Sequence, residues 1–551
     1  MRCRITLEKQ REPGYVEPMS LSDAVGPRGF LWVNRLLLLA VALMGIAHVA
    51  FLPPFEGFDE TNHFSYVQQI ADTGTIPRFR IDKASVDVEG YQGPHAYSPS
   101  PPYDKVGGGL TYRSFFNGTT VPSLQPENPL AYRPGHIQNG EAQHPPLYYA
   151  VMAPFYLVAK SWSWPGVFLN LRLASWALAF AGFLVGCLAT QRALLKLKVA
   201  PALCLLPAAW PFLFPQFFPE MARLGNDSLC LFLMGIGWWL VLRILDRGRA
   251  SDTVWLGVVF GLGLLTKAFF VPIVAGAVCL LCFQELRARD GGTHFRNPII
   301  LLVVSLLVGG GWYLYRYLTV GSFITANDIS VIQDKGSVLA QIASSFGILE
   351  GVRGIGQLVV SFAWAGTWSY GRFNPIFTLP VILLAAFPLY NWVIRLRRAP
   401  APVIAPLFLV APMVLGLCYY MLTQIARGPG AAGTPGWYLH MLAGPLSLVL
   451  VIGWRWRLIQ AVLAAYAIAY HVVLWAMQLS LFSGCAFKAG DYKYTQFDFG
   501  TCFILPDRLA VLGEPLLGGI ALATAVVLAV IAAVHWRRIS HSDGLALAGR
   551  G

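Results

Sequence analysis

Two carboxylates and a histidine lie close together in the turn-rich segment 53–77. Asp59 and Glu60 are adjacent, and His63 follows one helical turn later. A carboxylate in such a cluster can take a proton from an acceptor hydroxyl or amine. The segment directly follows an apolar run, so the cluster is expected at a membrane surface, where polar groups are often functional. The alternative interpretation is an acidic loop whose charges face water.

The composition indicates a polytopic membrane protein. Of 551 residues, 56% are hydrophobic and 13% are charged, and the mean hydropathy is +0.55. A water-soluble domain carries about 25% charged residues. The formal net charge of +13 would also suit nucleic-acid binding, but the basic residues cluster at the ends of apolar runs, as topology signals do. We therefore predict no nucleic-acid partner.

The apolar runs predict an all-α bundle of about twelve transmembrane helices. Each span needs roughly 17–25 apolar residues, and two of the predicted spans are short. The spans are 30–52, 167–190, 199–217, 228–245, 254–267, 268–284, 297–317, 376–394, 403–424, 437–453, 458–480 and 511–535. The first run is too long for the apolar core of a secretory signal and lacks a small-residue cleavage site, so it is expected to remain uncleaved.

Basic residues set the expected sidedness of the bundle. If the N-terminus is cytoplasmic, every inner connection is basic, from the one containing Arg192 to the one containing Arg538. This pattern is what the positive-inside rule requires. Segments 1–29 and 536–551 are then both cytoplasmic, and residues 30–535 form a single membrane domain.

The outer face is expected to carry three long loops. They span residues 53–166, 318–375 and 481–510, and the first two exceed ordinary connection lengths, which is typical of functional segments. Apolar stretches at 144–158 and 354–370 are predicted as helices lying in the outer interface.

Nine cysteines are present, and two of them flank a polar outer segment. These two, Cys485 and Cys502, are candidates for a disulfide on the oxidising side. The pair Cys279 and Cys282 is spaced like half a zinc site, but no second pair accompanies it. The cysteines inside apolar runs are predicted as small core residues: Cys187, Cys204, Cys230, Cys279, Cys282 and Cys418.

This topology places polar residues from several loops and span ends on the outer face. They are Asp59, Glu60, His63, Glu141, Gln143, His144, Arg172, Arg223, Asn226, Asp227, Lys267, Arg372, Tyr438 and His440. Cations at membrane depth are costly unless an anion pairs with them, and a lipid phosphate or pyrophosphate is a natural partner. Carboxylates with cations suggest a base for a nucleophile and a clamp for a phosphate leaving group. The alternative for each cation is an anchor that extends to the interface.

Several short motifs, taken in order, resemble the GT-C class of membrane glycosyltransferases. They are Pro-Pro-Phe-Glu-Gly-Phe-Asp-Glu-Thr-Asn-His from residue 53, Gln-His-Pro-Pro-Leu-Tyr-Tyr from residue 143, Asn226-Asp227 and Leu265-Thr266-Lys267. The resemblance is to bacterial members of the kind that includes aminoarabinose and protein O-mannosyl transferases. A further stretch resembles a Gly-Arg-Tyr-Leu family motif but carries Trp437 in place of the arginine. The Trp-Trp-Asp-Tyr-Gly signature of oligosaccharyltransferases is absent.

The resemblance implies an inverting transferase that uses a polyprenyl-phosphate-linked sugar. It implies an outer-face site in the bacterial inner membrane and a lipid, polysaccharide or protein acceptor. By this analogy Asp59 is the base, with support from Glu60 and Asp227. The residues implied to bind the donor phosphate are Lys267, Arg172 and Arg372. The residues implied to shape the acceptor side are His63, His144, Glu141, Asn226, Tyr438 and His440.

No cofactor is required by this scheme. His63, Glu60 and His144 could nevertheless hold a divalent metal.

Two other functions fit parts of the pattern. A lipid or glycan transporter would place ionisable groups near the middle of several spans and would show an internal repeat; neither feature is visible. A polymerase or ligase for lipid-linked glycans would share the phosphate clamp, but it would need a glycan channel rather than a carboxylate base.

Overall fold

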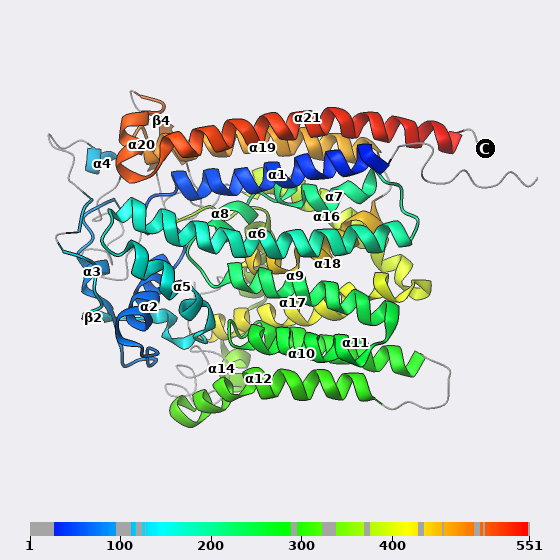
Figure 1. The fold of residues 1–551 in the computed structure, drawn as a ribbon, viewed down its shortest axis with the longest axis horizontal. Coiled ribbons are helices and arrows are strands. Elements are labelled where there is room, and N and C mark those ends of the chain that lie inside the picture. Colours follow the sequence, from blue (N-terminus) through cyan, green and yellow to red (C-terminus); the bar gives the residue numbers. More distant parts are fainter. Residues whose placement is uncertain are drawn as a thin grey trace, which may run out of the picture.

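The computed structural model describes most of the chain. The described residues are 27–94, 112–116, 124–126, 128–287, 295–321, 338–368, 375–427, 435–454, 457–489, 496–499 and 502–548. Long helices lie side by side, and most of the short elements gather at one end of them (Figure 1). The start of α1 and the end of α21 both lie at the opposite end (Figure 1). The two described ends of the chain therefore share one end of the bundle, as the predicted topology requires.

Ten helices within the described residues are long and apolar enough to cross a membrane. They are α1 (Pro27–Phe51), α6 (Trp164–Lys196), α9 (Asp227–Arg247), α11 (Phe270–Arg287), α12 (Arg296–Val320), α16 (Pro375–Arg395), α17 (Ala401–Arg427), α18 (Ala443–Gly453) together with the preceding η4 (Gly436–Leu442), α19 (Arg457–Phe482) and α21 (Pro515–Ala548). The all-α polytopic prediction is confirmed, whereas the count of about twelve is not.

The two other predicted spans are shorter helices. The run 199–217 contains η2 (Leu203–Leu205), α7 (Leu206–Leu213) and the start of α8 (Phe217–Ala222). It carries four prolines, which interrupt helical hydrogen bonding. The run 254–267 becomes α10 (Ala250–Leu264), which packs against α9 and α12.

Shorter elements build the end of the bundle that carries the long loops. The helices are α2 (Glu60–Thr73), α3 (Val86–Glu89), α4 (Tyr112–Phe116), η1 (Gly140–Gln143), α5 (Leu147–Ala159), α14 (Val338–Ser345), α15 (Ile348–Ala363) and α20 (Pro506–Leu512), and a short η3 (Leu396–Arg398) follows α16. Two small antiparallel sheets pair β1 (Lys83–Ser85) with β2 (Pro134–Gln138) and β3 (Ala486–Ala489) with β4 (Gln496–Phe499).

The two predicted interfacial segments are helical in the structure. The segment 144–158 forms α5, and the segment 354–370 overlaps α15. α15 begins earlier than expected, directly after Gly347, and ends at Ala363 because the backbone of Trp364 is extended. Residues 369–370 lie outside the described residues, and the depth of both helices in a membrane stays a prediction.

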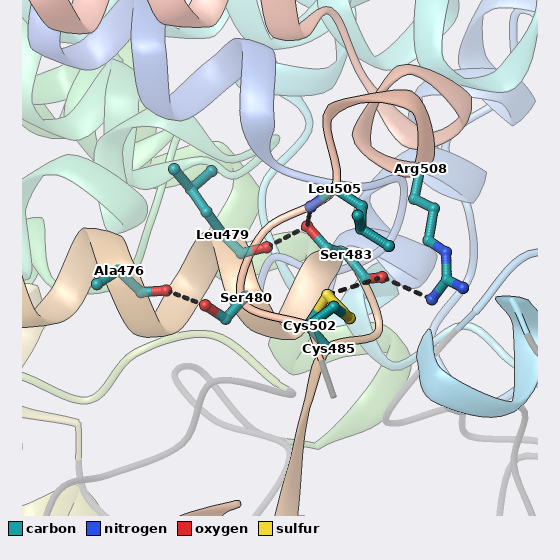
Figure 2. The surroundings of a disulfide bond; sticks show 8 residues. All are labelled: Ala476, Leu479, Ser480, Ser483, Cys485, Cys502, Leu505 and Arg508. Carbon is teal, nitrogen blue, oxygen red and sulfur yellow. Dashed lines mark hydrogen bonds between the residues drawn. A yellow bond between two sulfur atoms is a disulfide. The ribbon is translucent and has the colours of Figure 1, made fainter. Parts of the chain in front are cut away.

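A disulfide joins Cys485 and Cys502, as predicted. Figure 2 shows how the same junction is held by hydrogen bonds at the end of α19. The Ser483 hydroxyl accepts from the Leu505 amide (3.1 Å), and the Ser483 carbonyl accepts from the Arg508 guanidinium (3.2 Å). The disulfide and these hydrogen bonds thus connect the end of α19 to the start of α20.

The prediction that the remaining cysteines are core residues is only partly right. Cys187, Cys204 and Cys230 are buried, whereas Cys279 is exposed and Cys282 and Cys418 are half-buried. A lipid-facing surface is as apolar as a protein core, so hydropathy alone does not separate the two positions.

Glycines allow α6 and α9 to pack closely. A side-chain carbon at Gly235 would lie 2.0 Å from the carbonyl oxygen of Gly182, and one at Gly182 would lie 2.3 Å from Phe232 Cα. Small residues of this kind let helix backbones approach in membrane proteins. Nearby, the Trp238 indole donates to the Thr190 hydroxyl at 2.9 Å.

We expect Gly235→Ala to destabilise the protein by about 1–3 kcal/mol, because the added methyl overpacks the α6–α9 contact. Gly311→Ala is the matched control on α12, since no described atom lies within 4 Å of the added carbon. It should be neutral or stabilising by up to about 1 kcal/mol. Unfolding of both variants in mixed micelles measures the difference, and equal stabilities would contradict close packing at Gly235.

Candidate active site

A cavity lies where the long loops meet the ends of the long helices. It encloses about 120 Å³ and is lined by segments far apart in sequence. Asp59, Glu141 and His144 contribute acidic and imidazole groups, while Lys267 and Arg316 contribute cations. Its aromatic wall consists of Phe269, Trp312, Tyr313, Tyr420 and Tyr438. The predicted convergence of Asp59 with Lys267 at one place is therefore present.

Asp59 occupies the turn between α1 and α2. It precedes α2 with a left-handed backbone (φ 59°, ψ 11°), and its side chain does not cap the helix. Aspartate and asparagine tolerate this conformation better than most residues. Burial raises the pKa of Asp59 to about 6, and the negative charge of Glu141 adds to the effect, while Arg223, Lys267 and His144 oppose it. A carboxylate with this pKa is suited to act as a base near neutral pH.

Glu141 is held between two histidines. Its Oε2 lies 3.0 Å from His144 Nε2 and 3.7 Å from His63 Nδ1, and the same His63 nitrogen lies 3.0 Å from the Tyr149 hydroxyl. Burial works against ionisation of Glu141, but its interactions with His144 and His63 outweigh that effect and hold its pKa below the ordinary value. Burial lowers the pKa of His63 to about 3. Glu141 is thus a fixed negative charge beside Asp59.

Lys267 lies in the turn between α10 and α11. Its ammonium donates to both carboxylate oxygens of Asp227, at 2.8 and 3.0 Å, and lies 4.2 Å from the ring centre of Tyr438. Asp227 also accepts from Arg223 at 2.8 Å. Arg223 binds Glu220 at 2.5 Å and the carbonyl oxygen of Phe58, directly before Asp59, at 2.9 Å. This chain of ion pairs connects Lys267 to the backbone next to Asp59.

A second buried ion pair lies behind Asp59. Arg172 donates to Glu60 through Nε (2.8 Å) and a terminal amino group (2.5 Å), and it also donates to the carbonyl oxygens of Leu52 and Pro53. Glu60 accepts further from the amides of Gly57 and Leu224. Arg172 is 1% exposed and Glu60 is fully buried.

These contacts differ from the predicted roles, in which Arg172 binds the donor phosphate and Glu60 supports the base. Neither lines the cavity, so Arg172 does not stand where a donor phosphate would bind there, and Glu60 does not stand beside its acceptor. The sequence analysis could not reveal that these two side chains pair with each other, and their position at the outer face stays a prediction.

The other predicted residues divide into two groups. Tyr438 lines the cavity, whereas His440 binds the carbonyl oxygen of Phe362 at 3.0 Å and is fully buried away from it. Asn226 is buried at the start of α9 and also lies outside the cavity wall. Arg372 lies outside the described residues.

Arg316 is the functional candidate that the sequence analysis missed. It lies near the end of α12, inside the predicted span 297–317, where the surrounding run is apolar. An arginine within such a run is costly in a membrane. That cost is the signal that could have identified it.

The described residues contain no group of three His, Cys, Asp or Glu side chains arranged to hold a metal ion. In the predicted trio, Glu60 binds Arg172, while His63 and His144 both contact Glu141. That the chemistry requires no metal, and that these side chains could hold one, both stay predictions.

Comparisons with known proteins give remote structural similarities. No protein-family model and no curated protein matches the chain. ArnT from Cupriavidus metallidurans bound to undecaprenyl phosphate is 12% identical, with a TM-score of 0.44 over 94% of this chain and 72% of that one. The Archaeoglobus fulgidus oligosaccharyltransferase in complex with Zn and sulfate is 12% identical, with a TM-score of 0.40 over 79% of this chain and 51% of that one.

The archaeal oligosaccharyltransferase AglB from Archaeoglobus fulgidus, with an inhibitory peptide and a dolichol-phosphate, is 12% identical, with a TM-score of 0.39 over 92% of this chain and 56% of that one. The chain thus spans about half the length of the oligosaccharyltransferase. At 12% identity and TM-scores of 0.39 to 0.44, these proteins are structures that the chain resembles.

We expect Arg172→Met to destabilise the protein by about 3–5 kcal/mol, because it leaves Glu60 buried without its cation. Lys196→Met is the control, since Lys196 forms an ion pair with Asp246 in which both side chains are exposed. Such surface pairs contribute at most about 1 kcal/mol. Unfolding in mixed micelles compares the two variants, and a similar small loss in both would show that Arg172 does not hold the segment that carries Asp59.

Proposed function

We propose that this chain is a membrane glycosyltransferase that transfers a sugar from a polyprenyl-phosphate donor to an acceptor bound at the cavity. The observation that carries the proposal is that Asp59 lines the same cavity as the cations Lys267 and Arg316. Burial raises the pKa of Asp59 to about 6. Displacement at a phosphate-linked sugar requires both elements: a base for the nucleophile and positive charge for the leaving group. The motifs that resemble the GT-C class add support.

In this mechanism the acceptor oxygen or nitrogen attacks the anomeric carbon of the donor sugar from the side opposite the phosphate. Asp59 takes the acceptor proton as the new bond forms. The bond from the anomeric carbon to the phosphate oxygen breaks, and its electron pair stays on that oxygen. The polyprenyl phosphate leaves with one more negative charge, which Lys267 stabilises. A single displacement of this kind inverts the anomeric configuration.

The surrounding residues act through Asp59 and Lys267. Asp227 binds the Lys267 ammonium and fixes its position. The Arg172–Glu60 pair holds the backbone from Leu52 to Glu60, which carries Asp59. Glu141, with its two histidines, keeps a negative charge beside Asp59 and so helps to keep the base at a useful pKa. These are positioning roles, and they replace direct roles for Glu60, Asp227 and Arg172 in this scheme.

The proposed site faces the outer, periplasmic side of a bacterial inner membrane, with both termini cytoplasmic. This orientation is supported by the basic clusters of the predicted inner connections. It is also supported by the position of the start of α1 and the end of α21, opposite the end that carries the short elements (Figure 1). The acceptor is then an envelope lipid, polysaccharide or protein.

We expect Asp59→Asn to lower sugar transfer by at least about a hundredfold, because general-base catalysis contributes roughly 10²–10⁴. Asparagine keeps the side-chain shape and tolerates the left-handed backbone. The assay incubates purified protein in lipid nanodiscs with labelled polyprenyl-phosphate sugars and total envelope lipids, and follows label in the product. Asp246→Asn, an exposed carboxylate at the opposite end of α9, is the control. Full activity of the folded Asp59→Asn protein would remove Asp59 as the base.

The pH dependence of transfer provides a separate test of the base. The carboxylate form is active, so the rate should fall as the pH drops through about 6. Glu141→Gln removes a negative charge that raises the Asp59 pKa, so the acidic limb of the profile should move to lower pH. Rates of both proteins measured from pH 4 to 8 give the comparison. An unmoved limb would mean that Glu141 does not tune the titrating group.

A further inference from the structure

Among the residues that the structure describes, Arg316 is a buried cation with no carboxylate paired to it. Its side chain is 3% exposed, and it lines the cavity together with its α12 neighbours Trp312 and Tyr313. Neither of its terminal amino groups has a hydrogen-bond partner in the part of the chain that the structure describes. Leaving such a group unsatisfied in a low-dielectric environment is strongly unfavourable. A bound anion would remove this cost.

The other buried cations are already paired. Among the described residues, four Arg or Lys side chains are buried, and Arg172, Arg223 and Lys267 each bind carboxylates. Lys267 is within the cavity wall but donates to both oxygens of Asp227. Of these four, Arg316 is therefore the cation whose charge is available to a ligand.

The Arg316 guanidinium has a defined orientation. Its Cζ lies 5.0 Å from the ring centre of Phe79, which belongs to the outer loop between α2 and β1. A cation–π contact of this kind holds the guanidinium plane without using its hydrogen-bond donors. The terminal amino groups thus stay available to a planar pair of oxygen atoms.

We infer that Arg316 is the residue that binds the phosphate of the lipid-linked donor, with Lys267 contributing only its electrostatic field. The inference rests on the proposed function. Arginine binds two phosphate oxygens in parallel, which a lysine cannot do. A sugar phosphodiester carries one negative charge, which matches one unpaired guanidinium, so the site selects donors with one phosphate over donors with two.

Binding without turnover tests this inference. Purified protein is titrated with a polyprenyl monophosphate, the corresponding polyprenyl diphosphate, the corresponding prenyl alcohol and inorganic phosphate, and tryptophan fluorescence reports binding. Arg316→Gln should weaken monophosphate binding roughly ten- to hundredfold, as expected for the loss of charge-assisted hydrogen bonds. The monophosphate affinity of Arg316→Lys should lie between those of the wild type and Arg316→Gln. The affinity for the alcohol should be the same in all proteins. Arg133→Gln, which removes an exposed outer-face cation, is the control.

Stability distinguishes a ligand-binding role from a structural one. Arg316→Gln should be at least as stable as the wild type without ligand, because it removes an unpaired buried charge. At the same concentration, added monophosphate should raise the melting temperature of the wild type more than that of Arg316→Gln. A variant that loses stability without ligand would identify Arg316 as structural.

Several outcomes would overturn the inference. They are unchanged monophosphate affinity in Arg316→Gln, equal binding of alcohol and monophosphate by the wild type, tighter binding of the diphosphate, or binding of inorganic phosphate as tight as that of the lipid. Arg316-dependent binding without any sugar transfer would refute the proposed function alone. Transfer with unchanged binding in Arg316→Gln would refute this inference alone.

Discussion

Charges buried at the edge of an apolar bundle have to be neutralised inside the protein, and this requirement organises the whole site. A charge that is desolvated without a partner costs several kcal/mol (about 3–5 for a broken pair). The chain meets the requirement with two buried systems: Arg172 with Glu60, and Lys267 with Asp227 and Arg223. Each system joins segments that are distant in sequence, so the ion pairs fix the segment 52–60 to the ends of the long helices.

These ion pairs determine which charged side chains remain available to act on a ligand. Glu60 and Asp227 are bound by cations, whereas Asp59 lies beside the negative charge of Glu141 and has a raised pKa. Lys267 and Arg172 are bound by carboxylates, whereas Arg316 has no hydrogen-bond partner at its terminal amino groups among the described residues. One carboxylate suited to accept a proton and one cation suited to bind an anion thus line the same cavity.

Rigidity and chemistry are linked through the backbone before α2. Arg172 binds the carbonyl oxygens of Leu52 and Pro53, and Arg223 binds that of Phe58. These contacts hold the backbone that leads into Asp59, which adopts a left-handed conformation. A residue in a sparsely populated backbone region persists only when its surroundings fix it. The buried arginines provide that support, and Asp59 owes its position to them.

The sequence by itself determined the apolar helical bundle and the Cys485–Cys502 bridge, and its larger set of predicted site residues contained five that line one cavity: Asp59, Glu141, His144, Lys267 and Tyr438. It could do so because spans of known length fix the depth of every residue, and basic clusters indicate the side. Only the tertiary structure decided which charges pair, since helix packing sets the face on which each side chain lies. Glu60 and Arg172 are 112 residues apart, and Arg316 lies within an apolar run. Depth is encoded locally along the chain, but a buried charge finds its partner, or lacks one, only when the helices pack together.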